Sequence, residues 1–303
     1  MSVPYSPDPK GPTSVARAAR PRDFVAVVDT PWRRTSVLRD SSWQRRNRVK
    51  TKDADRLPEP TDEATQRLRS RLRLTTPLIA VYDSRPSDAF EPLVEPRGTT
   101  CCFAYYGRWL VGETLVLEKG GAGCQGAYRA LGLEKTYPPY MAHFLTDGVG
   151  APKGEGLRAS PEIAQAYLDR ATPPEVSGDA VLIGPLRLNQ WSSVRSITFL
   201  VDPDRLGGVM TLAGYWSAED VVAAPFGSGC SFLWRALNQS DGDPAVIGAT
   251  DIAMRRHLPA NILTFTVSPA RFRQMLTFPE GSFLTRSWWN DLLDYRARTQ
   301  EGH

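Results

Sequence analysis

Strand-like and helix-like sequence patterns alternate along the chain from residue 61 to residue 297. Short apolar runs typical of buried strands occur at residues 77–82, 113–118, 179–183, 196–201, 245–248 and 262–267. Segments typical of helices lie between them, at residues 61–74, 101–109, 123–131, 160–170, 204–215, 268–276 and 288–296, with a short one after Asp251. Alternation of this kind predicts one sheet with helices packed against it. We therefore predict an α/β (α+β) fold, a mixed sheet flanked by helices, in a single domain over residues 61–297.

Residues 1–60 differ in composition from the rest of the chain, being rich in Pro, Arg, Ser and Asp with one apolar stretch at residues 24–28. Residues 1–75 hold 17 Lys and Arg against 9 Asp and Glu, whereas the whole chain has a net charge of only +4. We predict a basic, Pro-rich, partly extended N-terminal arm that docks on a partner or pairs two copies of the chain. No recognised binding motif accompanies its basic run beside Trp43, which argues against nucleic acid. Residues 298–303 are predicted to be a disordered tail.

The composition is that of a globular protein, with 41% hydrophobic residues. No apolar run approaches the ~20 residues of a membrane-spanning helix, and residues 1–20 lack the apolar core of a signal peptide. We therefore expect a soluble, cytoplasmic protein without a membrane partner. The four cysteines are too few and too unevenly spaced for a secreted disulfide framework of this size. In a reducing compartment they are thiols or metal ligands.

Small or hydroxyl-bearing residues precede a cysteine at three places, each at the start of a helix-like stretch. These places are Gly98-Thr99-Thr100-Cys101-Cys102, Gly120-Gly121-Ala122-Gly123-Cys124 and Gly227-Ser228-Gly229-Cys230. Unpaired N–H groups and the positive end of the helix dipole favour anions, so a thiol placed there shifts toward the thiolate. Thiolate is the form that binds metals or attacks electrophiles. The shared pattern therefore indicates a thiolate-ligated metal or iron–sulfur site.

Cys102, Cys124 and Cys230 are the predicted metal ligands, with Cys101 as a candidate fourth. Backbone that approaches a cluster closely and donates hydrogen bonds to its sulfurs is predicted at Gly123, Gln125, Gly227, Ser228 and Gly229. The competing interpretation is that each cysteine is a small buried hydrophobic residue. Spacings of 22 and then 106 residues match no CxxC-type zinc or ferredoxin pattern, so the metal is left open between an iron–sulfur cluster and zinc.

Other catalytic chemistries have little support in the sequence. The three histidines form no HExxH motif and offer little for a Ser-His-Asp triad. His143, in an irregular aromatic loop, and Asp251, before a short helix, are the weak catalytic candidates. A structural histidine and a helix cap are the simpler interpretations of the two. Glycine-rich loops without GKS/T or a strand-bound GxGxxG do not support nucleotide binding, although residues 227–230 suit a small anion.

Residues 61–293 resemble the uncharacterised domain-of-unknown-function 169 (DUF169) family of archaea and anaerobic bacteria. The resemblance rests on Thr76-Pro77 leading to Ile79-Ala80-Val81, on Cys102 beginning a helix with Arg108, on Gly123-Cys124-Gln125-Gly126-Ala127 followed by Ala130-Leu131-Gly132-Leu133, on Ser160-Pro161-Glu162, and on Ser228-Gly229-Cys230. It implies that Cys102, Cys124 and Cys230 are the family's recurrent cysteines, with Cys101 as an extra neighbour. Family members often have another cysteine where this chain has Gly248-Ala249-Thr250. The resemblance implies no activity.

The leading hypothesis is a metalloprotein, with an iron–sulfur cluster that binds or acts on a small molecule at an open position. As an enzyme it would be an iron–sulfur lyase or a sulfur-handling enzyme, and residues 137–156 would cover the site. The alternative is a non-enzymatic module that binds a small molecule or anion, with structural cysteines and a basic arm that docks on a partner.

Overall fold

The computed structural model describes residues 57–147, 154–170, 173–218, 221–224, 229–233, 245–248 and 252–300, all within the second of two compact units, Ser41–His303. The predicted N-terminal arm lies almost wholly outside the described residues. The same holds for the apolar stretch at residues 24–28 and for the basic run beside Trp43.

Within the described residues, eight strands form one mixed sheet in the order β2-β3-β4-β1-β5-β8-β7-β6. The strands are β1 (Ile79–Tyr82), β2 (Leu93–Val94), β3 (Thr114–Glu118), β4 (Ala180–Pro185), β5 (Val194–Val201), β6 (Val222–Ala223), β7 (Ala245–Ile247) and β8 (Leu263–Val267). Among these described strands, the two outermost pairs, β2 with β3 and β6 with β7, are parallel, and the other neighbours are antiparallel. The predicted mixed sheet of an α+β protein is thus confirmed.

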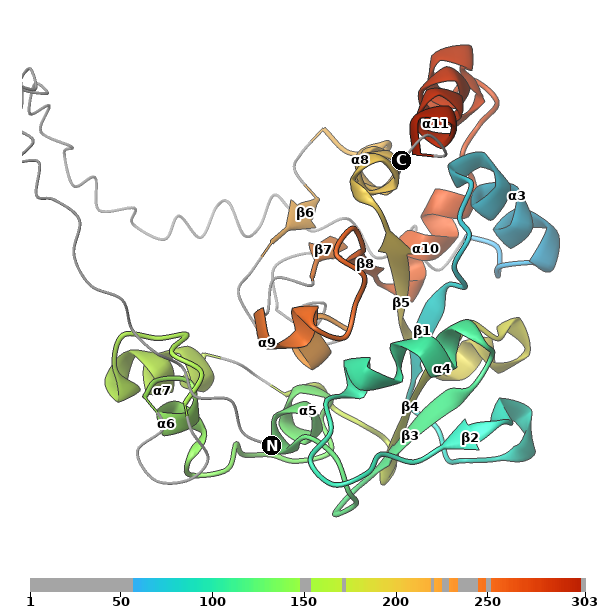
Figure 1. The fold of residues 1–303 in the computed structure, drawn as a ribbon. Coiled ribbons are helices and arrows are strands. Elements are labelled where there is room, and N and C mark those ends of the chain that lie inside the picture. Colours follow the sequence, from blue (N-terminus) through green and yellow to red (C-terminus); the bar gives the residue numbers. More distant parts are fainter. Residues whose placement is uncertain are drawn as a thin grey trace, which may run out of the picture. The chain divides into compact units, whose positions relative to one another are not determined.

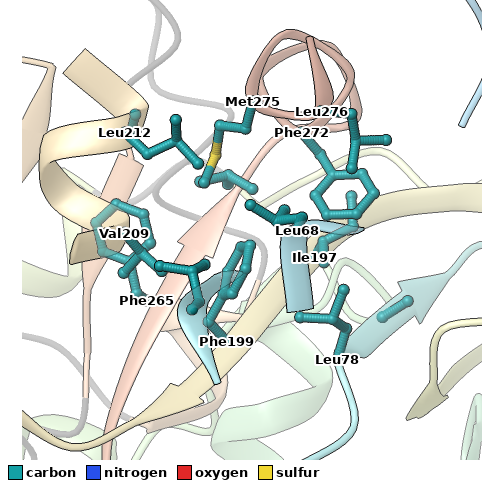
Figure 2. Packing of buried hydrophobic residues seen from close by; sticks show 14 of the residues in the cluster. Leu68, Leu78, Ile197, Phe199, Val209, Leu212, Phe265, Phe272, Met275 and Leu276 are labelled. Carbon is teal, nitrogen blue, oxygen red and sulfur yellow. The ribbon is translucent and has the colours of Figure 1, made fainter. Parts of the chain in front are cut away.

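One face of the sheet is covered by four helices: α3 (Asp62–Leu72), α8 (Pro203–Gly214), α10 (Pro269–Leu276) and α11 (Ser287–Gln300). Figure 1 shows these helices gathered together. In Figure 2 the side chains of Leu68, Val209 and Phe272, one from each of the first three helices, converge on Phe199 and Phe265 of the sheet. All five side chains are fully buried, so this layer is a continuous apolar core.

The second face carries shorter elements, and it is the face that holds the cysteines. These elements are η2 (Cys102–Tyr105), α4 (Tyr106–Leu110), α5 (Gln125–Ala130), η4 (Gly229–Phe232) and α9 (Ile252–Arg255). Along β1 the two faces alternate, because Ala80 and Tyr82 belong to the first core cluster while Ile79 and Val81 belong to the second. Burial on both faces explains why β1 and the first four residues of β4 are uninterrupted apolar runs in the sequence.

Several long helices begin at the same short motif, a polar cap followed by proline. The side chains of Ser160, Asp202 and Ser268 accept hydrogen bonds from the N–H groups three residues later, and proline occupies the first helical turn in each case. These caps open α7 (Pro161–Asp169), α8 and α10. Local chemistry therefore sets these helix starts, each of which lies within one residue of the start predicted from the sequence.

The remaining described elements are α6 (Met141–Phe144), η1 (Asp88–Phe90), η3 (Leu188–Ser193) and η6 (Phe283–Thr285). Neither these 3-10 turns nor the two-residue strands β2 and β6 are predicted from the sequence. In the part of the chain that the structure describes, no helix has the length and apolar character needed to cross a membrane.

Two neighbouring glycines of α8 give a matched test of the first core. A Cβ at Gly208 would lie 2.6 Å from ring atom Cη2 of Trp289 and 3.2 Å from Leu72, whereas a Cβ at Gly207 would meet nothing within 4 Å. The indole of Trp289 cannot move freely, because its Nε1 donates a 2.8 Å hydrogen bond to the carbonyl of Arg71. We expect Gly208→Ala to lower the free energy of unfolding by about 1–3 kcal/mol.

Gly207→Ala is the control, and it should raise the free energy of unfolding by up to about 1 kcal/mol through helix propensity. Urea titration of both variants measures the difference. Equal effects of the two substitutions would contradict the packing of α8 against α11.

Candidate metal centre

The segment that holds the first two cysteines is fixed to the sheet by aromatic packing. Phe103 and Trp109 are fully buried, and their ring centroids lie 5.5 Å apart in an edge-to-face contact. Cys102 begins η2 and is 2% exposed, whereas Cys101, the N-cap residue, is half-buried in an extended conformation. The predicted helix over residues 101–109 is confirmed as η2 followed directly by α4.

Cys230 reaches the same place from a distant part of the chain. It lies in η4, which packs against both η2 and α5, and it is 3% exposed. The buried hydroxyl of Ser196, in β5, donates a hydrogen bond to the carbonyl of Leu233 directly after η4. This bond ties η4 to the central part of the sheet.

The sulfur atoms of Cys101, Cys102 and Cys230 all lie within 4.8 Å of one another. Cys102 and Cys230 are paired as a disulfide, and their Cα atoms are 6.7 Å apart, a separation that disulfides span. Within the described residues, this is the one cluster of three or more cysteine, histidine or acidic side chains close enough to share a metal ion. The pairing of Cys102 with Cys230 argues against an iron–sulfur cluster in that state, because a ligand must be a thiolate.

Cys124 stands outside this group, although its helix packs against η4. It is the N-cap of α5, its carbonyl accepts a 2.9 Å hydrogen bond from the N–H of Ala127, and its half-buried side chain lies at the edge of the second-face core. The sequence pattern groups Cys102 and Cys230 with Cys124 and makes Cys101 the extra ligand. The structure instead brings Cys101 together with the two buried cysteines.

Gly123 holds together the two loops that precede Cys102 and Cys124. Its N–H donates a 2.6 Å hydrogen bond to the carbonyl of Gly98, and its φ of 136° lies in the region that favours glycine. A Cβ there would lie 3.2 Å from the ring of Tyr128, whose hydroxyl donates a 2.6 Å hydrogen bond to Ala122. Gly123 therefore serves loop packing. Burial raises the pKa of the neighbouring Tyr128, with a smaller contribution from the charge of Glu118.

Of the four remaining residues predicted to contact a cofactor, two lie in described elements and two do not. Gln125 is exposed in the first turn of α5, and Gly229 opens η4. Gly227, Ser228 and the catalytic candidate Asp251 lie outside the described residues.

The second catalytic candidate, His143, is exposed on α6. Within the described chain its ring forms no hydrogen bond or ion pair. Helices α6 and α7 form a small core of their own, made of Met141, Ala142, Ala164 and Leu168. A Cβ at Gly126 would lie 3.5 Å from Met141 and 3.7 Å from the sulfur of Cys124, so α6 reaches the second face beside Cys124. That the loop at residues 137–156 covers the three-cysteine group stays a prediction.

A cleft of about 730 Å³ lies beside η2, and the sequence analysis did not identify it. Its lining includes Glu95, Arg97, Tyr105, Arg108 and Glu118. The hydroxyl of Tyr105 accepts a 2.9 Å hydrogen bond from the N–H of Arg97. These residues are ordinary surface residues in the sequence, and only the fold places them around one hollow.

Comparison with models of protein families matches residues 67–277 to DUF169, described as uncharacterised ArCR. The match covers more than two thirds of the chain and confirms the resemblance drawn from the sequence. No curated protein and no solved structure matches the chain. The comparisons therefore give a family and name no activity.

The hydrogen bond from Ser196 to Leu233 can be tested with a matched pair of buried serines. Ser196→Ala leaves the carbonyl after η4 without its donor, and we expect the free energy of unfolding to fall by about 1–3 kcal/mol. We also expect iodoacetamide to alkylate Cys230 faster in the reduced, folded protein, as measured by mass spectrometry.

Ser282→Ala is the control, because the hydroxyl of Ser282 is equally buried and forms no hydrogen bond within the described chain. Unchanged alkylation of Cys230 in Ser196→Ala would show that this bond does not hold η4 in place.

Proposed function

The chain belongs to the DUF169 family, and we propose that it is a cysteine-ligated metalloprotein in which Cys101, Cys102 and Cys230 bind one metal centre. The observation that carries this proposal is the distance of at most 4.8 Å between each pair of their sulfur atoms. A disulfide brings only two sulfur atoms together. A metal ion shared by three cysteines needs a third sulfur atom at the same place, and Cys101 supplies it.

The sulfur spacing supports a single ion better than a cluster. Metal–sulfur bonds of about 2.3 Å in tetrahedral geometry place two thiolates roughly 3.8 Å apart, which is compatible with the observed limit. A [4Fe–4S] cluster puts each thiolate on a different iron and so spreads the ligands farther apart. Zinc is therefore the first choice of metal, and the cluster predicted from the sequence is the second.

Three thiolates leave one tetrahedral position open. Structural zinc sites fill all four positions with protein ligands, whereas catalytic sites keep one for water or substrate. Cys124 lies outside the three-sulfur group, although its helix packs against η4, and it is not one of the proposed ligands. The metal could polarise a small molecule bound at the open position.

Metal analysis of protein purified anaerobically with a phosphine reductant tests this proposal. We expect about one zinc per chain, with the affinity of Cys102→Ser and Cys230→Ser at least about tenfold lower, because each loses a buried ligand. Cys101→Ser should show a smaller loss, and Cys124→Ser is the control that keeps the metal.

Iron with acid-labile sulfide and an absorbance band near 400 nm would instead support the cluster. Two results would refute the proposal: reduced protein that binds neither metal, or loss of metal in Cys124→Ser equal to that in Cys102→Ser.

The cleft beside η2 supports a second candidate function, the binding of a small molecule without chemistry. Within the described residues, the guanidinium of Arg97 and the carboxylates of Glu95 and Glu118 form no hydrogen bond or ion pair, while Arg108 is paired with Glu113. A hollow that offers unpaired groups of both signs fits a zwitterion such as a free amino acid.

Thermal unfolding in the presence of single amino acids tests this second candidate. We expect at least one of them to raise the midpoint by about 2 °C or more, since a ligand that binds only the folded state stabilises it. Arg97→Ala should abolish the shift. Arg85→Ala, an exposed arginine outside the cleft lining, should retain it. An equal shift with inorganic phosphate would show simple anion binding.

A further inference from the structure

We propose that the three cysteines also form a redox-sensitive site, in which Cys101 reacts first with a hydroperoxide and the oxidation ends as the Cys102–Cys230 disulfide. The inference rests on the proposed function only where it concerns loss of the metal. The route of oxidation follows from the positions of the three sulfur atoms themselves.

Disulfide and metal exclude each other at this site. The disulfide pairs two of the three sulfurs that would ligate the metal, and a disulfide sulfur is no longer a thiolate. Oxidation by two electrons therefore converts a three-thiolate site into one that retains a single thiol, on Cys101. A single thiol does not hold zinc, so the metal leaves.

The difference in exposure assigns the first step to Cys101. Cys102 and Cys230 are 2% and 3% exposed, whereas Cys101 is half-buried and therefore open to a small oxidant in solution. Oxidation of cysteine follows both thiolate character and access. Cys101 also lies within 4.8 Å of both buried sulfurs, so the oxidised atom needs no large movement to meet a second thiol.

The chemistry balances in three steps. The Cys101 thiolate attacks hydrogen peroxide, the O–O bond breaks, and Cys101 sulfenic acid and, after protonation, water form. The thiol of Cys230 then displaces the sulfenic hydroxyl, which gives a Cys101–Cys230 disulfide and a second water. Finally the sulfur of Cys102 attacks the sulfur of Cys230 and loses its proton, and Cys101 leaves as a thiolate that takes up a proton. Two thiols and one peroxide thus give one disulfide and two waters.

The Cys102–Cys230 disulfide suits a stable oxidised state, because both of its cysteines are buried. The Cys102–Cys230 bond joins segments 128 residues apart in the sequence, η2 and η4, which already pack against each other. Reductants in solution reach its two sulfurs poorly, while the neighbouring Cys101 thiolate can reopen it by the reverse of the exchange step. Cys101 is therefore the residue that reacts first both when the disulfide forms and when it is reduced.

Peroxide titration of the reduced full-length chain, followed by non-reducing peptide mapping, tests the route. Trypsin leaves Cys101 and Cys102 in one peptide, between Arg97 and Arg108, so fragment spectra must locate the bond. In Cys101→Ser we expect the same final disulfide, formed at least about tenfold more slowly. In Cys102→Ser we expect the trapped Cys101–Cys230 disulfide, and in Cys230→Ser a sulfenic acid on Cys101 that reacts with dimedone.

Cys124→Ser is the control and should oxidise like the unaltered chain. Circular dichroism and the unfolding midpoint of each reduced variant show that it is folded before the titration. Oxidation of Cys101→Ser at the unaltered rate overturns the proposal, as does a Cys102→Ser variant without the Cys101–Cys230 bond.

A chromogenic chelator measures the zinc that the protein releases during oxidation. Zinc released in step with disulfide formation supports the proposal that the disulfide displaces the metal. Reduced protein that binds no metal overturns both the proposed function and the release of metal on oxidation. In that case the positions of the disulfides in each variant still test the order of the oxidation steps. Metal that stays bound after the disulfide has formed overturns the release of metal on oxidation but leaves the proposed function standing.

Discussion

The packing of η4 against η2 and α5, over the second face of the sheet, is the contact on which the candidate site depends. It brings together cysteines that are 128 residues apart in the sequence. The contact is secured at the sheet by the hydrogen bond from Ser196 to Leu233 and among the helices by a shared apolar core. Because each element is too short to be stable alone, the position of the sulfur atoms is a property of the whole face.

The sheet supports this arrangement because both of its faces are buried. The first face carries the long helices and the larger aromatic core. The second face holds a smaller core. It can be built from 3-10 turns and one- or two-turn helices, whose ends place backbone N–H groups and thiols side by side. This difference between the two faces is possible because most strand residues are buried, whichever face they point to.

Local sequence signals predicted the fold well, because local chemistry determines it. The caps at Ser160, Asp202 and Ser268 are complete within four residues of sequence, and the apolar runs of the strands need no partner to be recognised. The membership of the cysteine group was harder to predict. Cys101 and Cys124 precede helices in similar contexts, and only tertiary packing decides which of the two meets Cys230. The cleft at η2 was missed for the same reason, since its charged residues have no common sequence pattern.

Burial of two thiols side by side limits the states that this site can adopt. A thiolate in an apolar core is costly, so Cys102 and Cys230 must be neutral thiols, be bonded to each other, or share a cation. The last two states both remove the isolated charge, and both need the same closeness of the sulfur atoms. A site shaped for one is therefore shaped for the other. Because Cys101 is the partly exposed member of the group, an oxidant or a reductant in solution acts through it to favour the disulfide or the metal-bound state.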